Sequence, residues 1–268
     1  MCSVSGRARA LTRHWVIQAR KTQSVGWEYL IGWLRAILWL PVLPWVYFSR
    51  KWLSNTAKGK QSFSPGQVSR WALTTRYINL HHREDRNRET RLELSGVGLK
   101  NVERFEAFQH SVGALGCALS HAAVLETLAS SDVPVALVCE DDIEFLGDAG
   151  QLEVVLGDFM SRPELDVLCL SFRLRGPALP IGANLALANN IQTTAGYVAK
   201  RSAFAPLIDS FRQSARGLER GAPIEKASID VRWKTLQYSR LLFCIPRAPI
   251  ARQRESHSDI VGKVKFYG

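Results

Sequence analysis

The sequence predicts an α/β domain in which helices flank a sheet. Its 268 residues, 46% of them hydrophobic, can form one large domain with an appendage or two small domains. Short apolar runs typical of buried strands alternate with segments of helical periodicity. One run, Val135–Cys139, leads into Glu140, Asp141 and Asp142. Since ligands of open α/β sheets bind at the carboxyl ends of strands, the predicted fold also places a site there.

The first quarter of the chain carries nearly all of its positive charge. Residues 1–70 hold 11 basic and 1 acidic side chains, whereas residues 71–268 hold 24 and 23. The same quarter contains six of the eight tryptophans. This combination favours an anionic membrane surface as a partner. A nucleic-acid-binding protein would spread Lys and Arg over the folded domain, so we expect no nucleic-acid partner.

The longest apolar run covers residues 26–48. From Leu30 to Phe48 its only charge is Arg35, but Pro41 and Pro44 would interrupt a helix that spans a bilayer. Because basic residues flank the run on both sides, we expect it to lie in the membrane interface. A spanning helix and simple packing against the folded domain remain alternatives. We therefore divide the chain into a hydrophobic, helical membrane-associating segment (1–57), a linker (58–70) and a folded domain (71–268).

The folded domain is predicted to begin with a strand and a charged helix. Thr74–Leu80 has the pattern of a strand, and Arg83–Leu94 that of a helix. Basic residues just after a first strand can contact the phosphates of a nucleotide. Glu and Arg three and four apart also pair on exposed helices, which is the interpretation we prefer for Arg88 and Arg91. Val102–Phe108 alternates with period two and predicts a second strand.

A helix is predicted over Gly113–Ala129, because its apolar residues recur at the spacing of one helical face. Small residues near its start indicate tight packing or a close ligand. His121, taken alone, is more typical of a hydrogen-bonded structural histidine than of a catalytic one. The helix directly precedes the acidic strand, which favours a strand–helix–strand crossover.

The second half of the chain predicts further strands and helices. Residues 173–189 show little pattern and are predicted to form a loop over the site. Gly196 lies in a predicted strand and permits a close backbone approach. Beyond Pro246 we expect a polar tail. The strands are predicted over residues 165–172, 191–199 and 241–245, and the helices over 151–160, 202–216 and 224–234.

The five cysteines are widely spaced and include no Cys-x-x-Cys pair. We therefore expect no structural zinc, and the apolar surroundings of four of them indicate reduced thiols.

The acidic triplet predicts a cation site. Glu140, Asp141 and Asp142 would repel one another unless a cation held them. A hard divalent ion takes oxygen ligands from carboxylates and from a diphosphate. A solvated acidic turn is the alternative, and the residues alone leave both open.

Seven short segments occur in order over residues 75–260. They are Tyr77-Ile-Asn-Leu80 with Arg83 and Asp85-Arg86, Arg104-Phe-Glu-Ala107, Gly116-Cys-Ala-Leu-Ser-His121, Ala136-Leu-Val-Cys-Glu-Asp-Asp-Ile143, Ala195-Gly-Tyr-Val198, Ile229-Asp230 and Ser258-Asp-Ile260. Together they resemble glycosyltransferase family 25, the lipopolysaccharide-biosynthesis type. The most specific combination is the Gly-Cys-Ala-Leu-Ser-His segment followed by the strand that ends Glu-Asp-Asp.

The resemblance implies a GT-A-like, Rossmann-type nucleotide-binding fold with a mixed sheet. It implies an inverting transfer of galactose or glucose from a UDP-sugar to a hydroxyl of a glycan or glycolipid. It favours Glu140 and Asp142 as ligands of Mn²⁺ or Mg²⁺, and a location on the cytoplasmic face of a Gram-negative inner membrane. The donor-binding residues that it implies are Asn79, Leu80, Arg83, Arg86, Ala107, Ser120, His121, Asp141 and Gly196.

Transfer to a hydroxyl also needs a base that accepts its proton. Asp230 is the first candidate and Glu144 the second, although Asp230 is also placed to cap a helix. Two other functions remain alternatives, a metal-dependent phosphotransferase and a non-catalytic, membrane-associated binding protein with a transferase-like fold.

Overall fold

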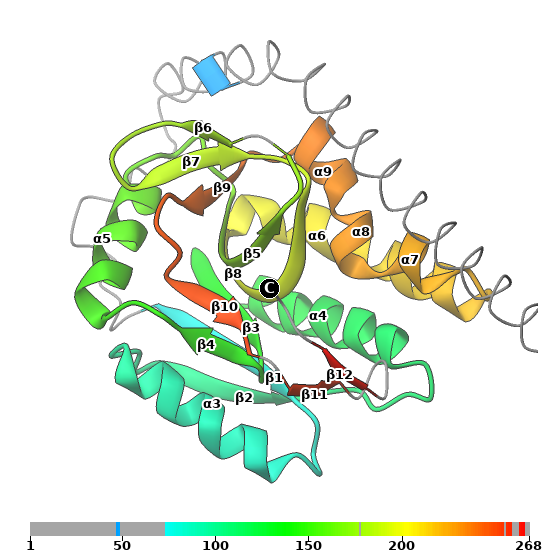
Figure 1. The fold of residues 1–268 in the computed structure, drawn as a ribbon. Helices are drawn as coiled ribbons and strands as arrows, with labels where there is room; N and C mark the ends of the chain where they lie inside the picture. The colour runs from blue at the N-terminus through cyan, green and yellow to red at the C-terminus, as the bar shows by residue number, and fades with distance from the viewer. Residues whose placement is uncertain (1–46, 49–72, 177, 255, 259–262, 266–268) are drawn as a thin grey trace, which may run out of the picture.

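The computed structural model describes residues 47–48, 73–176, 178–254, 256–258 and 263–265 (Figure 1). The predicted membrane-associating segment and linker lie outside these residues, apart from Tyr47 and Phe48. Among the described residues, no helix combines the length and apolarity that crossing a bilayer requires.

A mixed eight-stranded sheet forms the centre of the domain. Its strands run in the order β2-β1-β3-β8-β5-β9-β7-β6. β1 pairs in parallel with β2 and β3, and β5 pairs in parallel with β9, whereas the remaining pairs are antiparallel. The strands are β1 (Thr74–Asn79), β2 (Val102–Glu106), β3 (Val135–Glu140), β5 (Val167–Leu174), β6 (Ala178–Pro180), β7 (Leu185–Ala188), β8 (Ile191–Lys200) and β9 (Phe243–Pro246).

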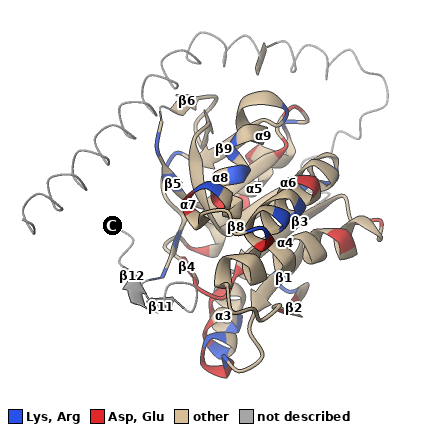
Figure 2. Cartoon of the chain, turned by 90° about the vertical axis from the view of Figure 1, so that its right-hand side faces the viewer, with Lys and Arg blue, Asp and Glu red and all other residues tan. Residues whose placement is uncertain are grey.

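Helices cover both faces of this sheet (Figure 1). One hydrophobic core packs the sheet against α4 (Gly113–Ala129), α6 (Arg201–Glu219) and the short helices α7 (Ile224–Ala227), α8 (Ile229–Arg232) and α9 (Lys234–Ser239). The other core packs it against α3 (Glu84–Gly96) and α5 (Ala149–Met160). The predicted α/β architecture is therefore confirmed, with the sheet mixed as expected. Figure 2 shows charges of both signs along α3.

The strand–helix–strand unit around the acidic triplet is also confirmed. α4 has the predicted bounds and connects β2 to β3, two parallel strands of one sheet with β1 between them. β3 is buried along its apolar length and ends at Glu140, which is partly exposed. The three carboxylates therefore emerge at the carboxyl end of a central strand.

The prediction of an open loop over residues 173–189 is wrong. The first two of these residues end β5, and the later ones form the hairpin of β6 and β7, which extends the sheet beyond β9. All four residues of β7 are buried, so apolar burial stabilises a strand that is too short to show a periodic pattern. The helix predicted over 224–234 is likewise divided into α7, α8 and the start of α9.

The polar tail expected beyond Pro246 contains a further strand. β10 (Ala251–Gln253) pairs antiparallel with β4 (Ile143–Phe145), which follows directly after the acidic triplet. The backbone N–H of Arg254 also donates to the carbonyl of Asp142, at 2.6 Å. Residues 251–254 thus lie against the end of the acidic triplet. β11 (Ser256–Ser258) and β12 (Lys263–Lys265) form a separate two-stranded sheet.

Tyr47 and Phe48 are the described part of the tryptophan-rich apolar run. Tyr47 is buried in the core shared with α5, and its hydroxyl accepts a hydrogen bond from Nη1 of Arg162 at 3.1 Å. This end of the run packs against the domain, one of the alternatives that the sequence left open. The interfacial placement of the remaining run stays a prediction.

Candidate active site

The Gly116–His121 segment of α4 serves two purposes. A side chain at Gly116 would collide with the carbonyl oxygen of Phe108, since a Cβ there would lie 2.4 Å from it. One turn later, Oγ of Ser120 accepts a hydrogen bond from the Phe108 N–H at 2.9 Å and donates to the Gly116 carbonyl. The loop after β2 is thereby held against the helix. Cys117 and His121, from the same segment, line the cavity beside it.

Asp141 anchors the acidic triplet to the first strand and helix. Its carboxylate accepts a hydrogen bond from Nδ2 of Asn79 at 2.7 Å and forms an ion pair with Arg86 at 2.8 Å. Its backbone carbonyl accepts from the Thr90 hydroxyl. Burial raises the pKa of Asp141 despite these partners. Because Asn79 and Arg86 each hold one of its carboxylate oxygens, Asp141 fixes the triplet in place.

Asp142 has an oxygen available for a cation. Its Oδ2 accepts a hydrogen bond from Nε2 of Gln253 at 2.8 Å. Its Oδ1 is buried and has no hydrogen-bond partner within the described part of the chain. Burial, together with the neighbouring Glu140 carboxylate, raises the pKa of Asp142 to about 7. A buried carboxylate oxygen without a donor is a suitable ligand for a positive ion.

Glu140 is held by groups on two other elements. Its Oε1 accepts from the Thr194 hydroxyl at 2.7 Å and lies 3.4 Å from Nε2 of His121. Burial alone would raise the pKa of Glu140, but His121 and Thr194 outweigh it and hold the pKa below its ordinary value. Glu140 is therefore ionised at neutral pH and adds negative charge beside Asp142.

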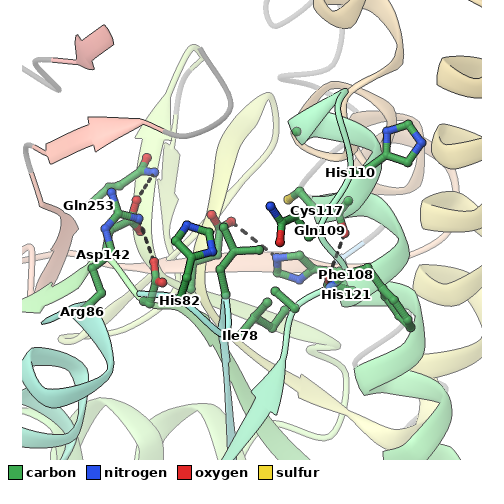
Figure 3. Close-up of a pocket in the computed structure, with 17 residues that line it drawn as sticks. Ile78, His82, Arg86, Phe108, Gln109, His110, Cys117, His121, Asp142 and Gln253 are labelled. Atoms are coloured by element: carbon green, nitrogen blue, oxygen red, sulfur yellow. Dashed lines mark hydrogen bonds and ion pairs between the residues drawn. The ribbon is translucent and has the colours of Figure 1, made fainter. Parts of the chain in front are cut away.

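These carboxylates line a cavity of about 330 Å³ between β1, α3, α4 and the end of β3. Figure 3 shows Arg86, Asp142 and Gln253 on one side of it and Cys117 and His121 on the other. Its lining includes six of the predicted donor-binding residues: Leu80, Arg86, Ala107, Ser120, His121 and Asp141. Asn79 is joined to this group through Asp141.

A second cavity, of about 640 Å³, contains Asp230. It is bounded by β5, β8, β10 and the short helix α8, and its lining includes Arg173, Arg175 and Arg252. Asp230 lies in the first turn of α8, and its Oδ1 accepts a hydrogen bond from the hydroxyl of Ser228, the residue at the N-cap position of that helix. Glu140, Cys117 and Gln253 line both cavities, so the two adjoin at the acidic site.

Four predicted site residues lie outside both linings: Asn79, which contacts Asp141, and Glu144, Arg83 and Gly196. Glu144 pairs with Arg252 across β4 and β10, with contacts of 2.8 and 3.1 Å, and this partner lowers its pKa. Arg83 forms two hydrogen bonds with Asp85. Gly196 does allow a close approach, but of a protein side chain, because a Cβ there would lie 2.5 Å from Cδ1 of Ile143.

Sequence reasoning missed Gln253, Thr194 and Tyr197. Gln253 and Thr194 donate to the carboxylates of Asp142 and Glu140, and the Tyr197 hydroxyl lies 3.2 Å from Nδ1 of His121. Tyr197 directly follows Gly196 and Thr194 precedes it by two residues, so the predicted strand could have indicated both. No local pattern marks Gln253, because its position depends on the pairing of β10 with β4.

The carboxylates fit a hard divalent cation. Asp142 presents an unpartnered buried oxygen, and Glu140 is ionised beside it in the same cavity. Oxygen-only ligands of this kind suit Mg²⁺ or Mn²⁺. The amide of Gln253 donates a hydrogen bond to Asp142 and so orients its carboxylate, as groups that hydrogen-bond to metal ligands do.

The model of a protein family described as Glycosyltransferase family 25 (LPS biosynthesis protein) matches residues 78–168. This range is 91 of the 268 residues and runs from β1 to β5, so it contains the Gly116–His121 segment and the acidic triplet. Asp230 and Gln253 lie outside it. No curated protein sequence matches the chain.

Several solved structures show distant similarity. A glycosyltransferase involved in the glycosylation of the major capsid of PBCV-1 is 9% identical, with a TM-score of 0.46 over 69% of this chain and 94% of that one. A mannose-1-phosphate geranyltransferase from Thermus thermophilus is 11% identical, with a TM-score of 0.35 over 67% of this chain and 58% of that one. A197 from STIV is also 11% identical, with a TM-score of 0.35 over 73% and 100%.

At these TM-scores the structural likeness is too distant to define the fold family. The family match and the site geometry, in contrast, coincide in the same stretch of sequence. The resemblance to glycosyltransferase family 25 is thus confirmed over residues 78–168, the part of the chain that contains the acidic triplet and the Gly116–His121 segment.

Proposed function

We propose that the protein is a metal-dependent, inverting glycosyltransferase with a GT-A-like fold. It moves a hexose, galactose or glucose, from a UDP-sugar to a hydroxyl of a lipopolysaccharide or related glycan. The observation that carries this proposal is the pair of carboxylates, Glu140 and Asp142, which lie in the family-matching segment and line one cavity, with Glu140 also lining the cavity that adjoins it.

The donor side is the cavity lined by the triplet. Arg86 and Asn79 hold Asp141 and so fix the backbone from which Glu140 and Asp142 project. Glu140 and Asp142 would hold Mn²⁺ or Mg²⁺, and the ion when bound neutralises charge that develops on the departing diphosphate. His82 and Gln109 belong to the same lining and would face a donor bound there.

The acceptor side is the cavity that contains Asp230. An inverting transfer needs a base that takes the proton of the attacking hydroxyl, on the side opposite the leaving group. Asp230 lines the second cavity, whereas most of the predicted donor-binding residues line the first. Glu140 lines both cavities. Ser228 donates to one carboxylate oxygen of Asp230 and orients the other. This arrangement favours Asp230 over Glu144, which is paired with Arg252.

The decisive measurement is turnover of nucleotide sugars by the full chain with Mn²⁺. We expect hydrolysis of, or transfer from, one UDP-hexose, and a loss of at least about a hundredfold in Asp142→Asn, because removing a metal-ligand charge removes stabilisation of the leaving diphosphate. Asp209→Asn, at an exposed aspartate of α6, is the matched control and should keep full activity.

Turnover that is unaffected by Asp142→Asn would contradict the assignment of the metal ligands. A chain that binds no nucleotide sugar with any divalent metal would refute the enzyme itself. Phosphoryl transfer without glycosyl transfer would instead support the phosphotransferase alternative.

We also propose that the protein acts at an anionic membrane surface, the cytoplasmic face of the inner membrane of a Gram-negative bacterium. The support is the charge distribution of the sequence, with 11 basic and 1 acidic residues before residue 71. A glycolipid acceptor lies at such a surface, so attachment there would raise the local concentration of acceptor.

A further inference from the structure

A second set of metal-ligand side chains lies beside the acidic site, where the two cavities adjoin. Sγ of Cys117, a ring nitrogen of His121 and a carboxylate oxygen of Glu140 all lie within 4.8 Å of one another. Cys117 and His121 are four residues apart on α4, so both project from one face of the helix, as Figure 3 shows. Glu140 reaches them from the end of β3.

This set was not expected from the sequence, which contains no Cys-x-x-Cys pair. The spacing of four residues between Cys117 and His121 could have indicated the pair, because residues at i and i+4 of a helix are neighbours on its surface. The third member, Glu140, is 19 residues further along the chain and joins them only because β3 lies beside α4 in the fold.

The contacts of His121 direct its Nε2 toward Glu140. Its ring is fully buried, its Nδ1 lies 3.2 Å from the Tyr197 hydroxyl, and its Nε2 lies 3.4 Å from Oε1 of Glu140. No described residue gives this Nε2 a hydrogen bond of acceptable geometry. When Nδ1 carries the ring proton and Tyr197 accepts it, the Nε2 lone pair faces a carboxylate. A cation bound between the two makes that arrangement favourable, and a proton on Nε2 does so when no cation is bound.

Tyr197 has the position of an outer-shell partner. A metal-bound imidazole usually donates its other N–H to a nearby acceptor, which sets the ring's tautomer and orientation. The Tyr197 hydroxyl is buried with the ring of His121, and their rings stack at 5.8 Å between centroids. The histidine is thus oriented before any ligand arrives.

Cys117 supplies the soft ligand. Burial, with the carboxylates of Glu140 and Asp230 nearby, raises the pKa of its thiol well above the ordinary value. In the absence of a cation this thiol therefore stays protonated. A coordinated divalent ion displaces that proton, so binding at this position is accompanied by proton release.

We propose that Cys117, His121 and Glu140 form a binding site for a borderline-soft divalent cation, with Zn²⁺ as the best match. A thiolate, an imidazole and a carboxylate are the ligand types of zinc, whereas Mg²⁺ and Mn²⁺ prefer oxygen ligands alone. Three protein ligands leave one tetrahedral position open. Cys117 and Glu140 both line the cavities, so this position is reached from solvent.

The proposal goes beyond the transferase function. The ion differs from the Mn²⁺ or Mg²⁺ proposed for Glu140 and Asp142, and two of the three ligands, Cys117 and His121, do not belong to that site. Only Glu140 is shared with the site of Asp142. Variants of Asp142 and of Cys117 therefore separate the two sites, and either can fail without the other.

Titration of the full, metal-free chain with Co²⁺ tests the site without any assay of turnover. A cobalt–thiolate charge-transfer band is expected in the near ultraviolet, saturating at a single ion per chain and disappearing when Zn²⁺ displaces Co²⁺. The band should be lost in Cys117→Ser and His121→Gln. It should persist in Cys2→Ser, Cys244→Ser and Asp142→Asn. Tyr197→Phe should weaken binding by roughly ten- to a hundredfold, the usual effect of losing an outer-shell partner.

X-ray absorption at the zinc edge of the unmodified chain tests the same site with no variant that could misfold. One sulfur at about 2.3 Å and nitrogen or oxygen ligands at about 2.0 Å are expected. The absence of a cobalt band, a band that survives Cys117→Ser, or a zinc shell without sulfur would each overturn the proposal. In that case a proton, not a metal ion, lies between His121 and Glu140. A band without any glycosyl transfer would overturn only the proposed function.

Discussion

Asp142 is the residue whose protonation should control the acidic site. Its folded pKa is raised from 3.8 to about 7 by burial and by Glu140. A carboxyl with a raised folded pKa contributes stability that is complete below its unfolded pKa and is lost as pH rises through the folded value. In metal-free protein this loss falls between about pH 4 and pH 7.

The first prediction follows from this direction of the change in stability with pH. With chelator present, the free energy of unfolding of the wild type should fall as pH rises from about 4 to about 8, by at most about 4 kcal/mol for this group, since a pKa unit is worth about 1.4 kcal/mol. Asp142→Asn has no proton to lose there and should show a smaller fall. Urea unfolding of both proteins at several pH values measures the difference. Parallel curves would mean that Asp142 is already ionised in the folded protein.

The ion pair of Arg86 with Asp141 gives a second prediction at this scale. Both side chains are buried, and the carboxylate of Asp141 would be left without its charge partner in Arg86→Met. We expect this change to lower the free energy of unfolding by about 3–5 kcal/mol. Arg88→Met, at an exposed residue of the same helix, should change it by less than about 0.5 kcal/mol. Equal effects in denaturant unfolding would show that the buried pair adds no stability.

Among the elements, the placement of β4 depends on Gly196 in β8. Ile143, the first residue of β4, occupies the space where Gly196 has no side chain. In Gly196→Ala the new Cβ would lie 2.5 Å from Cδ1 of Ile143, so we expect a loss of about 1–3 kcal/mol in stability. Since valine has no Cδ1, Ile143→Val should recover part of that loss in the double variant. A double-mutant cycle by thermal or urea unfolding measures the coupling, and additive losses would count against this contact.

The elements also show what sequence patterns can and cannot predict. α4 was predicted with its observed bounds, because a long helix repeats its apolar face several times. β7 was missed, since four buried residues, Leu185–Ala188, contain no alternation and no length from which to infer a strand. β10 was missed because its partner β4 is more than 100 residues earlier, and the pairing that orders it leaves no local signal.

The candidate site shows the same difference between local motifs and contacts of distant segments. The acidic triplet and the Gly116–His121 segment were recognisable because each is a compact motif on one element. Gln253 and the meeting of Cys117 with Glu140 arise from contacts between distant segments. The sequence therefore indicated which carboxylates gather at the end of β3 but not which side chains orient them.

For the molecule as a whole, charge is divided unequally along the chain. Residues 1–70 carry most of the excess of basic side chains, and the rest of the chain is close to neutral. We predict that the full chain binds vesicles containing anionic lipid and is released as salt is raised, because screening weakens exposed charge interactions. Cosedimentation with anionic and with zwitterionic vesicles measures this.

A matched pair of variants locates the contact. Replacing Arg7, Arg9, Arg13, Arg20 and Lys21 by Gln should weaken vesicle binding at least about tenfold, since each basic residue near such a surface contributes about 1 kcal/mol. Five replacements at exposed positions of the folded domain, Arg88, Lys100, Arg201, Arg220 and Lys226, should have a smaller effect. If the replacements in the folded domain weakened vesicle binding more, the membrane contact would lie on the domain and not in the first quarter of the chain.

The pairing of β10 with β4 bears on how the protein is made. During synthesis, a nascent chain that has extended from the ribosome as far as Arg240 already contains β1, β3, β8 and the whole acidic triplet, but not the amide that orients Asp142. Gln253 emerges only afterwards, and β10 then joins a strand translated more than 100 residues before it. Incomplete translation products should therefore lack a finished acidic centre.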